Sequence, residues 1–246
     1  MVKIFSENLY IESHMTDARG YMKPAAFLNF TQEIACKHAD VLGFGFDTLR
    51  EENVAWILSR MHIKFNGYPR WKDYITVNTW HKWQERLFYL RDFSVKDSQG
   101  NDMILATTSW LLMNLETRRI SRHLSAEIYN NDNSNSAIEQ PCDKVVIPAG
   151  LESELVCEHR VSYSDLDVNQ HTNNVMYIVW AMDAVDSEIS TKISLKELKI
   201  NYNHETKLGD VINIYRTCVK EGDSIKCFIE GKFADGTSSF VTEFIF

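Results

Sequence analysis

The chain of 246 residues has few cysteines and prolines, more acidic than basic side chains, and no long apolar run. With four prolines and 44% apolar residues, it is neither disordered nor collagen-like. No apolar stretch approaches the roughly 18 residues that a membrane-spanning helix needs. The net charge of −8 disfavours binding to nucleic acid or anionic membranes, because both attract basic proteins.

The five cysteines are odd in number, scattered along the chain, and include no CxxC pair. We therefore expect reduced thiols and no disulfide. Reduced thiols are typical of cytosolic proteins. The first residues, MVKIFSENLYIESH, contain neither the apolar segment nor the cleavage site of a signal peptide. Together these features predict a cytoplasmic protein.

The first half of the chain predicts one long helix among several strands. The helix is expected at 24–43, where Pro24 suits the first turn and Gly43 suits the end. Alternating and β-branched residues predict the strands. These strands are expected at 4–12, 54–65, 74–83, 87–97 and 103–115.

The second half repeats this pattern. A segment rich in Asn, Asp and Ser predicts a linker at 126–152. After it we expect a strand and turn at 160–167, a helix at about 173–187, and strands at 195–203, 210–221, 224–233 and 238–246. In register, Ile63, Phe65, Tyr68, Pro69 and Asp73 match Ile200, Tyr202, Glu205, Thr206 and Asp210. The sequence therefore predicts an α+β fold of two similar units, 1–125 and 153–246, each a helix packed on an antiparallel sheet.

The second helix is apolar on nearly every side. Between Val175 and Asp186 only Asp183 and Asp186 are charged. Such a helix is buried, as it would be inside a curved sheet. An ordinary core helix without functional meaning explains this pattern equally well.

A run of polar side chains at alternate positions precedes this helix: Asp165, Asp167, Asn169 and His171. Whether the loop is extended or helical, Asp167 could orient the imidazole of His171 as a general base. Asn169 could hold a water or a carbonyl oxygen, beside the free N–H groups of the helix N-terminus. The plain alternative is a capping loop, but a cap needs one such residue and not four.

Metal binding has little support in these motifs. The DxDxN spacing resembles the start of a calcium loop, but Gln170 and Met176 replace its required Gly and Glu. A zinc site at His171, His204 and Glu205 would lack the HExxH spacing. We expect no metal, and the absence of a GxSxG elbow and a P-loop argues against serine-hydrolase and nucleotide chemistry.

The run DLDVNQHTNNVMYIVW closely resembles the signature of acyl-acyl carrier protein (ACP) thioesterases, the plant plastid and bacterial enzymes that end fatty-acid synthesis. In that family DxNxHxNN leads into the central helix of a hotdog fold, and Y-x-x-E-C follows on the next strand. The matching residues are Asp167, Asn169, His171, Asn173 and Asn174, then Tyr202, Glu205 and, in place of the Cys, Thr206. Family members carry two hotdog units in tandem, so the resemblance covers essentially the whole chain.

The resemblance implies hydrolysis of acyl-ACP to free fatty acid, with Asn169, His171 and Glu205 activating the attacking water and Asp167 supporting them. It places Asn173, Asn174 and Thr206 at the substrate. Because Thr206 is far less acidic than the family's Cys, water is the expected nucleophile. No cofactor is implied, since the substrate's phosphopantetheine belongs to ACP. A homodimer is left open.

The first half lacks this chemistry. Its turn, MTDARGYMKPAAF, has no His, and Tyr68 stands where Glu205 would. We therefore expect one active site, in the second half, and an acyl pocket shaped by the first. Candidate pocket residues are Phe27, Phe30, Ile34, Trp56, Ile57 and Leu58, although ordinary core packing explains each of them as well. ACP is strongly acidic, and candidate docking residues are Arg70, Lys72, Lys82, Arg86, Arg118, Arg119 and Arg122.

Three other functions would suit parts of this pattern. The same hydrolysis could act on acyl-CoA, in which case relative kcat/KM on the two carriers separates the substrates. A hotdog hydratase or dehydratase would use a His–Asp pair on enoyl thioesters. A non-catalytic lipid-binding module would release no thiol from any thioester.

Overall fold

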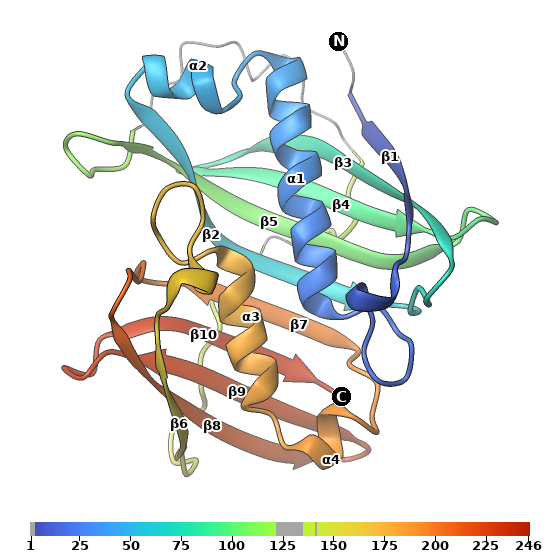
Figure 1. Cartoon of the computed structure of the whole chain (residues 1–246), viewed down its shortest axis with the longest axis vertical. Coiled ribbons are helices and arrows are strands. Elements are labelled where there is room, and N and C mark those ends of the chain that lie inside the picture. Colours follow the sequence, from blue (N-terminus) through green and yellow to red (C-terminus); the bar gives the residue numbers. More distant parts are fainter. Residues whose placement is uncertain (1–2, 122–134, 141) are drawn as a thin grey trace. The chain divides into compact units, whose positions relative to one another are not determined.

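The computed structural model describes residues 3–121, 135–140 and 142–246, and the chain divides into two compact units, Met1–Cys142 and Asp143–Phe246 (Figure 1). The linker expected at 126–152 therefore lies partly outside the described residues. Among the described helices, none has the length and apolar character needed to cross a membrane.

The first unit is an antiparallel sheet with one long helix across a face (Figure 1). Along the chain come β1 (Phe5–Tyr10), the 3-10 helix η1 (Ser13–Met15), α1 (Pro24–Leu42), α2 (Phe46–Glu51), β2 (Val54–Phe65), β3 (Tyr74–Glu85), β4 (Phe88–Lys96) and β5 (Asp102–Asn114). The strand order is β1-β3-β4-β5-β2. The predicted long helix and all five strands of this half are present, with ends shifted by no more than a few residues.

Local sequence explains both ends of α1. Pro24 occupies the first turn, where its missing N–H costs nothing, and Gly43 closes the helix in the left-handed region at φ 83°. The sequence did not predict the short helix α2. Its single buried residue, Leu49, packs in one apolar cluster with Phe44 and Val54, so tertiary packing supports the helix.

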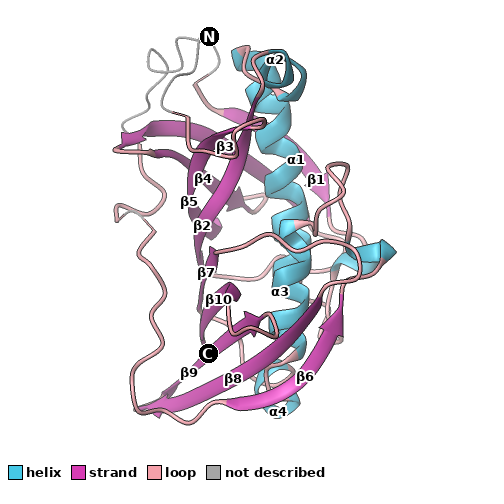
Figure 2. Ribbon diagram, turned by 90° about the vertical axis from the view of Figure 1, so that its left-hand side faces the viewer, coloured by secondary structure: helices cyan, strands magenta, loops and turns pink. Residues whose placement is uncertain are grey.

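The second unit repeats this arrangement. Its elements are β6 (Glu154–Arg160), the 3-10 helix η3 (Tyr163–Asp165), α3 (Asn174–Asp183), α4 (Ser187–Ser190), β7 (Glu197–Tyr202), β8 (Val211–Glu221), β9 (Ser224–Lys232) and β10 (Ser238–Ile245). The strand order is β7-β10-β9-β8-β6. The strand predicted at 160–167 lies earlier, at β6. In each unit the long helix covers one face of its own sheet, which is the hotdog arrangement (Figure 2).

The helix expected at 173–187 is two helices. Asn173 caps α3, and Asp186 caps α4 by accepting the N–H of Glu188 at 2.8 Å. The side chains that α3 buries are Val175, Tyr177, Ile178, Trp180 and Ala181. The apolar run therefore does form a core helix, and a new cap ends it earlier than periodicity suggested.

A segment at 135–140 lies against side chains of β3 and β4. Trp80 donates to the carbonyl of Asn135 at 2.8 Å, and Lys82 donates to the carbonyl of Ile138 at 3.1 Å. Asp92 accepts the N–H of Ala137 at 2.6 Å. These contacts leave Lys82 fully buried, 3.4 Å from the carboxylate of Asp92.

Lys82 was expected on the surface as a docking residue, and this expectation is wrong. An ammonium without solvent exposure has no surface to offer a partner. The other expected docking residues that the structure describes are exposed: Arg70, Lys72, Arg86, Arg118 and Arg119. Arg122 lies outside the described residues.

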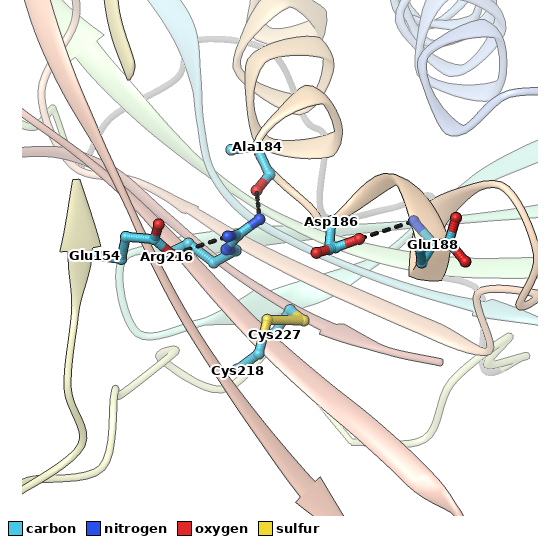
Figure 3. Close-up of a disulfide and its surroundings, with 7 residues drawn as sticks. All are labelled: Glu154, Ala184, Asp186, Glu188, Arg216, Cys218 and Cys227. Carbon is cyan, nitrogen blue, oxygen red and sulfur yellow. Dashed lines mark hydrogen bonds and ion pairs between the residues drawn. A yellow bond between two sulfur atoms is a disulfide. The ribbon is translucent and has the colours of Figure 1, made fainter. Parts of the chain in front are cut away.

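The expectation that all cysteines are reduced is also wrong, because Cys218 and Cys227 form a disulfide (Figure 3). Strands β8 and β9 form a tight hairpin that places the two cysteines directly opposite each other, with Cα atoms 4.2 Å apart. Nearby, Arg216 donates to the carbonyl of Ala184 at 3.1 Å and pairs with Glu154 at 2.8 Å. The cysteines therefore no longer support the expectation of a reducing, cytosolic compartment.

Replacing Asp92 tests the buried ion pair. We expect Asp92→Ala to lower the free energy of unfolding by about 3–5 kcal/mol, because it leaves the Lys82 ammonium buried without a counterion. The Asp92 side chain has no solvent exposure, and this burial raises the pKa of its carboxyl. Urea denaturation measures the loss.

Asp102→Ala is the matched control. Asp102 pairs with Lys96 at 2.8 Å, but both side chains are about two-fifths exposed, and solvent screens the pair. Its loss should cost at most about 1 kcal/mol. Equal losses in the two variants would contradict the distinction between the two pairs.

Counting reactive thiols tests the disulfide. Under denaturing, non-reducing conditions an alkylating reagent should label Cys36, Cys142 and Cys157 only. After reduction all five cysteines should be labelled. Intact-mass spectrometry separates the two patterns, and five labels without reduction would rule out the Cys218–Cys227 bond.

Candidate active site

The loop before α3 is a tight turn closed by backbone hydrogen bonds. The N–H of Asp167 donates to the carbonyl of His171 at 2.8 Å, and the N–H of Gln170 donates back to Asp167 at 3.0 Å. Gln170 has φ 64°, a left-handed conformation that non-glycine residues adopt at a cost. The turn thus places His171 two residues before Asn173, the N-cap of α3.

Asp167 holds the backbone of this turn. Its carboxylate accepts the N–H of Asn169 at 2.8 Å and the N–H of His171 at 3.3 Å. The amide of Asn169 reaches the same carboxylate at 3.5 Å, and Asn169 is exposed. The sequence suggested that Asp167 orients the imidazole, whereas its bonds are to main-chain N–H groups.

The carboxylate beside the imidazole belongs to Glu205. Its Oε2 lies 3.4 Å from Nδ1 of His171, and its Oε1 lies 3.8 Å from Nζ of Lys207. The side chains of His171 and Glu205 are 29% and 36% exposed, so a substrate can approach both. This pair joins two loops that are far apart in sequence.

Backbone pairing brings the two loops together. The N–H of Thr172 donates to the carbonyl of Thr206 at 3.0 Å, and His171 pairs with Lys207 in an isolated β-bridge. These contacts place residues 171 and 205 side by side. A carboxylate beside Nδ1 favours a proton on that nitrogen, which leaves Nε2 free to accept another.

Other expected site residues have local roles. The side chain of Asn173 caps α3 by accepting the N–H of Val175 at 3.0 Å, so the capping interpretation holds for this residue. Asn174 begins the helix, and its carbonyl accepts the hydroxyl of Tyr202 at 3.2 Å. Burial raises the pKa of Tyr202, which keeps this donor protonated.

Thr206 is fully buried and bonded to two hydroxyls. Its Oγ1 lies 2.6 Å from Oγ1 of Thr172 and 3.0 Å from the hydroxyl of Tyr177. Spacing in the sequence predicted neither Thr172 nor Tyr177 as part of this neighbourhood. Thr172 directly follows His171, as Thr206 directly follows Glu205, and that adjacency was the available signal.

A second His–carboxylate pair lies close by in sequence. His159 on β6 contacts the buried carboxylate of Asp165 at 3.0 Å and packs against Trp180 with ring centroids 4.2 Å apart and the rings tilted by 33°. Asp165 also accepts the N–H of Ser162 at 2.7 Å, and its carbonyl accepts the N–H of Asn173 at 2.8 Å. Asp165 therefore ties the 3-10 helix to the cap of α3.

The first unit has the same turn. The N–H of Asp17 donates to the carbonyl of Tyr21 at 2.8 Å, and that of Gly20 to Asp17 at 2.9 Å. The carboxylate of Asp17 accepts the N–H groups of Arg19 and Tyr21 at 2.9 and 3.0 Å. Gly20, at φ 77°, holds the place of Gln170 without strain.

The chemistry differs on this shared backbone. Tyr21 and Tyr68 occupy the places of His171 and Glu205, with ring centroids 5.5 Å apart. The junction between the two loops, formed in the second unit by the bond from Thr172 to Thr206, is also repeated. In the first unit the N–H of Met22 donates to the carbonyl of Pro69 at 2.8 Å. The expectation that Tyr68 stands where Glu205 would is therefore confirmed by the pairing.

Comparison with known proteins identifies the family. Residues 2–131 match the acyl-ACP thioesterase N-terminal domain, and residues 150–243 match the acyl-ACP thioesterase C-terminal domain. The chain belongs to the acyl-ACP thioesterase family. Within this family the two hotdog units of the fold correspond to the two matched domains.

Plant relatives are longer than this family member. The oleoyl-acyl carrier protein thioesterase 2 of Arabidopsis thaliana is 28% identical over 87% of this chain and 62% of its own length. The palmitoyl-acyl carrier protein thioesterase of Gossypium hirsutum is 31% identical over 87% of this chain and 55% of its own. The chain thus spans less than two thirds of these relatives.

Solved structures share the fold along nearly the whole chain. An acyl-ACP thioesterase from Bacteroides thetaiotaomicron is 27% identical, with a TM-score of 0.87 over 99% of this chain and 97% of that one. The 12:0-ACP thioesterase from Umbellularia californica, 23% identical, has a TM-score of 0.87 over 98% of this chain and 93% of its own, which is a likeness of fold.

The repeated turn gives a stability test for this family member. Asp167→Ala and Asp17→Ala each remove a carboxylate that accepts two backbone N–H groups. We expect each to lower the free energy of unfolding by about 1 kcal/mol, as for a lost helix cap. Urea denaturation of the two variants should give similar losses. A loss confined to one of them would contradict the equivalence of the turns.

Proposed function

We propose that this protein hydrolyses the thioester of acyl-ACP and releases free fatty acid and ACP thiol. The observation that carries the proposal is the His171–Glu205 pair at 3.4 Å in the second unit. The first unit has the same backbone there but two tyrosines, so acid–base chemistry is confined to one of the two turns. Membership of the acyl-ACP thioesterase family supports the substrate class.

The proposed reaction uses an activated water. Glu205 orients the imidazole of His171, which takes a proton from water as its oxygen bonds to the carbonyl carbon. The tetrahedral intermediate then collapses, the carbon–sulfur bond breaks, and the leaving thiolate takes up the proton that His171 removed from water, which restores the neutral imidazole. Asn169 is exposed on the turn and suited to bind the water or the carbonyl oxygen. Asp167 holds the turn that carries both.

Water is preferred over Thr206 as the nucleophile. The hydroxyl of Thr206 is fully buried and already bonded to Thr172 and Tyr177. A hydroxyl without solvent exposure is badly placed to attack a carbonyl carbon, and among the described residues its hydrogen-bond partners are hydroxyls, which are too weakly basic to activate it. This burial also argues against direct contact between the Thr206 side chain and substrate.

The remaining assignments concern the substrate. Phe27, Phe30 and Trp56 are the proposed acyl-pocket residues. Phe27 is fully buried and Trp56 packs against Tyr89 with ring centroids 4.8 Å apart, which ordinary core packing explains as well. Asn173 and Asn174 would act through the helix N-terminus they form. The substrate itself supplies phosphopantetheine, so no separate cofactor is proposed. The proposed compartment is the cytoplasm, without support from the thiols, since Cys218 and Cys227 are disulfide-bonded.

A thiol-release assay on acyl-ACPs of several chain lengths tests the function. His171→Ala and Glu205→Ala should each lower kcat by at least about a hundredfold, the scale of a lost acid–base group. Tyr21→Ala, at the matching place in the first unit, should keep kcat within about threefold, since no acid–base step is proposed there. A fully active His171→Ala variant would contradict the assignment of His171 as the general base.

An acyl-CoA arm of the same assay identifies the carrier. The proposal expects a higher kcat/KM on acyl-ACP than on the acyl-CoA of equal chain length. A higher value on acyl-CoA would transfer the function to that substrate. Failure to release thiol from either carrier would contradict thioester hydrolysis itself.

A further inference from the structure

Three buried hydroxyls form a hydrogen-bonded network that involves the two residues next in sequence to His171 and Glu205. Thr172 and Thr206, the residues that follow the pair in sequence, are joined through their Oγ1 atoms at 2.6 Å. The hydroxyl of Tyr177, on α3, lies 3.0 Å from Oγ1 of Thr206. The three side chains belong to residues that are at most 5% exposed.

The network also fixes the backbone at Thr206. The N–H of Thr206 donates to the hydroxyl oxygen of Tyr177 at 3.1 Å. That hydroxyl can then donate its own hydrogen to Oγ1 of Thr206, so Tyr177 is both acceptor and donor. Burial raises the pKa of Tyr177, which keeps the hydroxyl a neutral donor. A rigid helix residue thus holds the loop that carries Glu205.

The first unit shows that the fold does not require these hydroxyls. The residues equivalent to Thr172, Thr206 and Tyr177 are Met22, Pro69 and Phe27. The equivalence rests on the repeated bond at the junction, from Met22 to Pro69 in one unit and from Thr172 to Thr206 in the other. The first unit therefore forms the same junction with no side-chain hydroxyl at any of the three positions.

We infer that Thr206, held by Thr172 and Tyr177, is a positioning residue that sets the contact between Glu205 and His171. The hydroxyls occur in the unit with the acid–base pair and are absent from these positions in the unit without it. A buried hydroxyl fixes a loop in one place because an unmet hydrogen bond there is costly. The inference rests on the proposed function, since it concerns the same reaction.

Isosteric substitutions test this role by separating the hydroxyl from the volume of the side chain. Thr206→Val removes the hydroxyl and keeps the shape, and Thr206→Ser keeps the hydroxyl. We expect Thr206→Val to lower kcat by about 10- to 100-fold with little change in KM, because a small displacement of a reacting group has effects of that order. Thr206→Ser should keep kcat within about threefold. Tyr177→Phe, which removes only the hydroxyl of Tyr177, should lower kcat in the same way.

Thr242→Val is the matched control. Thr242 lies in the same unit, is fully buried, and donates one hydrogen bond to the carbonyl of Ile229 at 3.3 Å. Its replacement removes a buried hydrogen bond away from the pair, and kcat should stay at the wild-type value. Thermal unfolding of every variant checks that each is folded at the assay temperature.

The outcomes separate this inference from the proposed function. Wild-type kcat in Thr206→Val would overturn the positioning role, and so would a Thr206→Ser variant as slow as Thr206→Val. If Thr206→Val does not fold, Tyr177→Phe decides. If neither folds, the network serves the fold and the inference fails. A fully active His171→Ala would instead reject the proposed site itself.

Discussion

Backbone pairing organises the candidate site, through the hydrogen bond from the N–H of Thr172 to the carbonyl of Thr206 at 3.0 Å and the bridge between His171 and Lys207. It joins the loop before a helix to the loop after a strand, and the preceding residues, His171 and Glu205, become neighbours as a result. The bond between main-chain atoms brings the two loops together in both units, although the side chains that precede it differ.

The first unit shows that difference, because its turn and junction carry tyrosines instead of an acid–base pair. Asp17 and Asp167 accept backbone N–H groups in the same pattern, so a carboxylate at this position is a requirement of the turn. It cannot be what distinguishes the two units. The second unit differs in having the His171–Glu205 pair and the bonded hydroxyls of Thr172, Thr206 and Tyr177.

Much of the fold could be predicted from sequence because strand alternation and helix ends are local signals. Pro24 and Gly43 marked α1, and β2 has the predicted bounds. Burial by distant segments could not be predicted. Lys82 occupies an ordinary strand position, yet it is fully buried and donates to the carbonyl of Ile138, which lies more than fifty residues further along the chain. The disulfide, by contrast, was within reach, because a two-residue turn between β8 and β9 sets Cys218 opposite Cys227.

For the site, the sequence could supply the residues but not the bonds between them. Alternate spacing placed Asp167 near His171 correctly, yet spacing does not say whether a carboxylate meets a ring or a main-chain N–H. The repeat contains that information. A side-chain role found in both turns, such as that of Asp17 and Asp167, supports the fold. A side chain found in only one turn, such as His171, is available for catalysis. Gln170 fits the second group: Gly20 adopts the same left-handed conformation without strain, so the strained residue lies in the turn that carries His171.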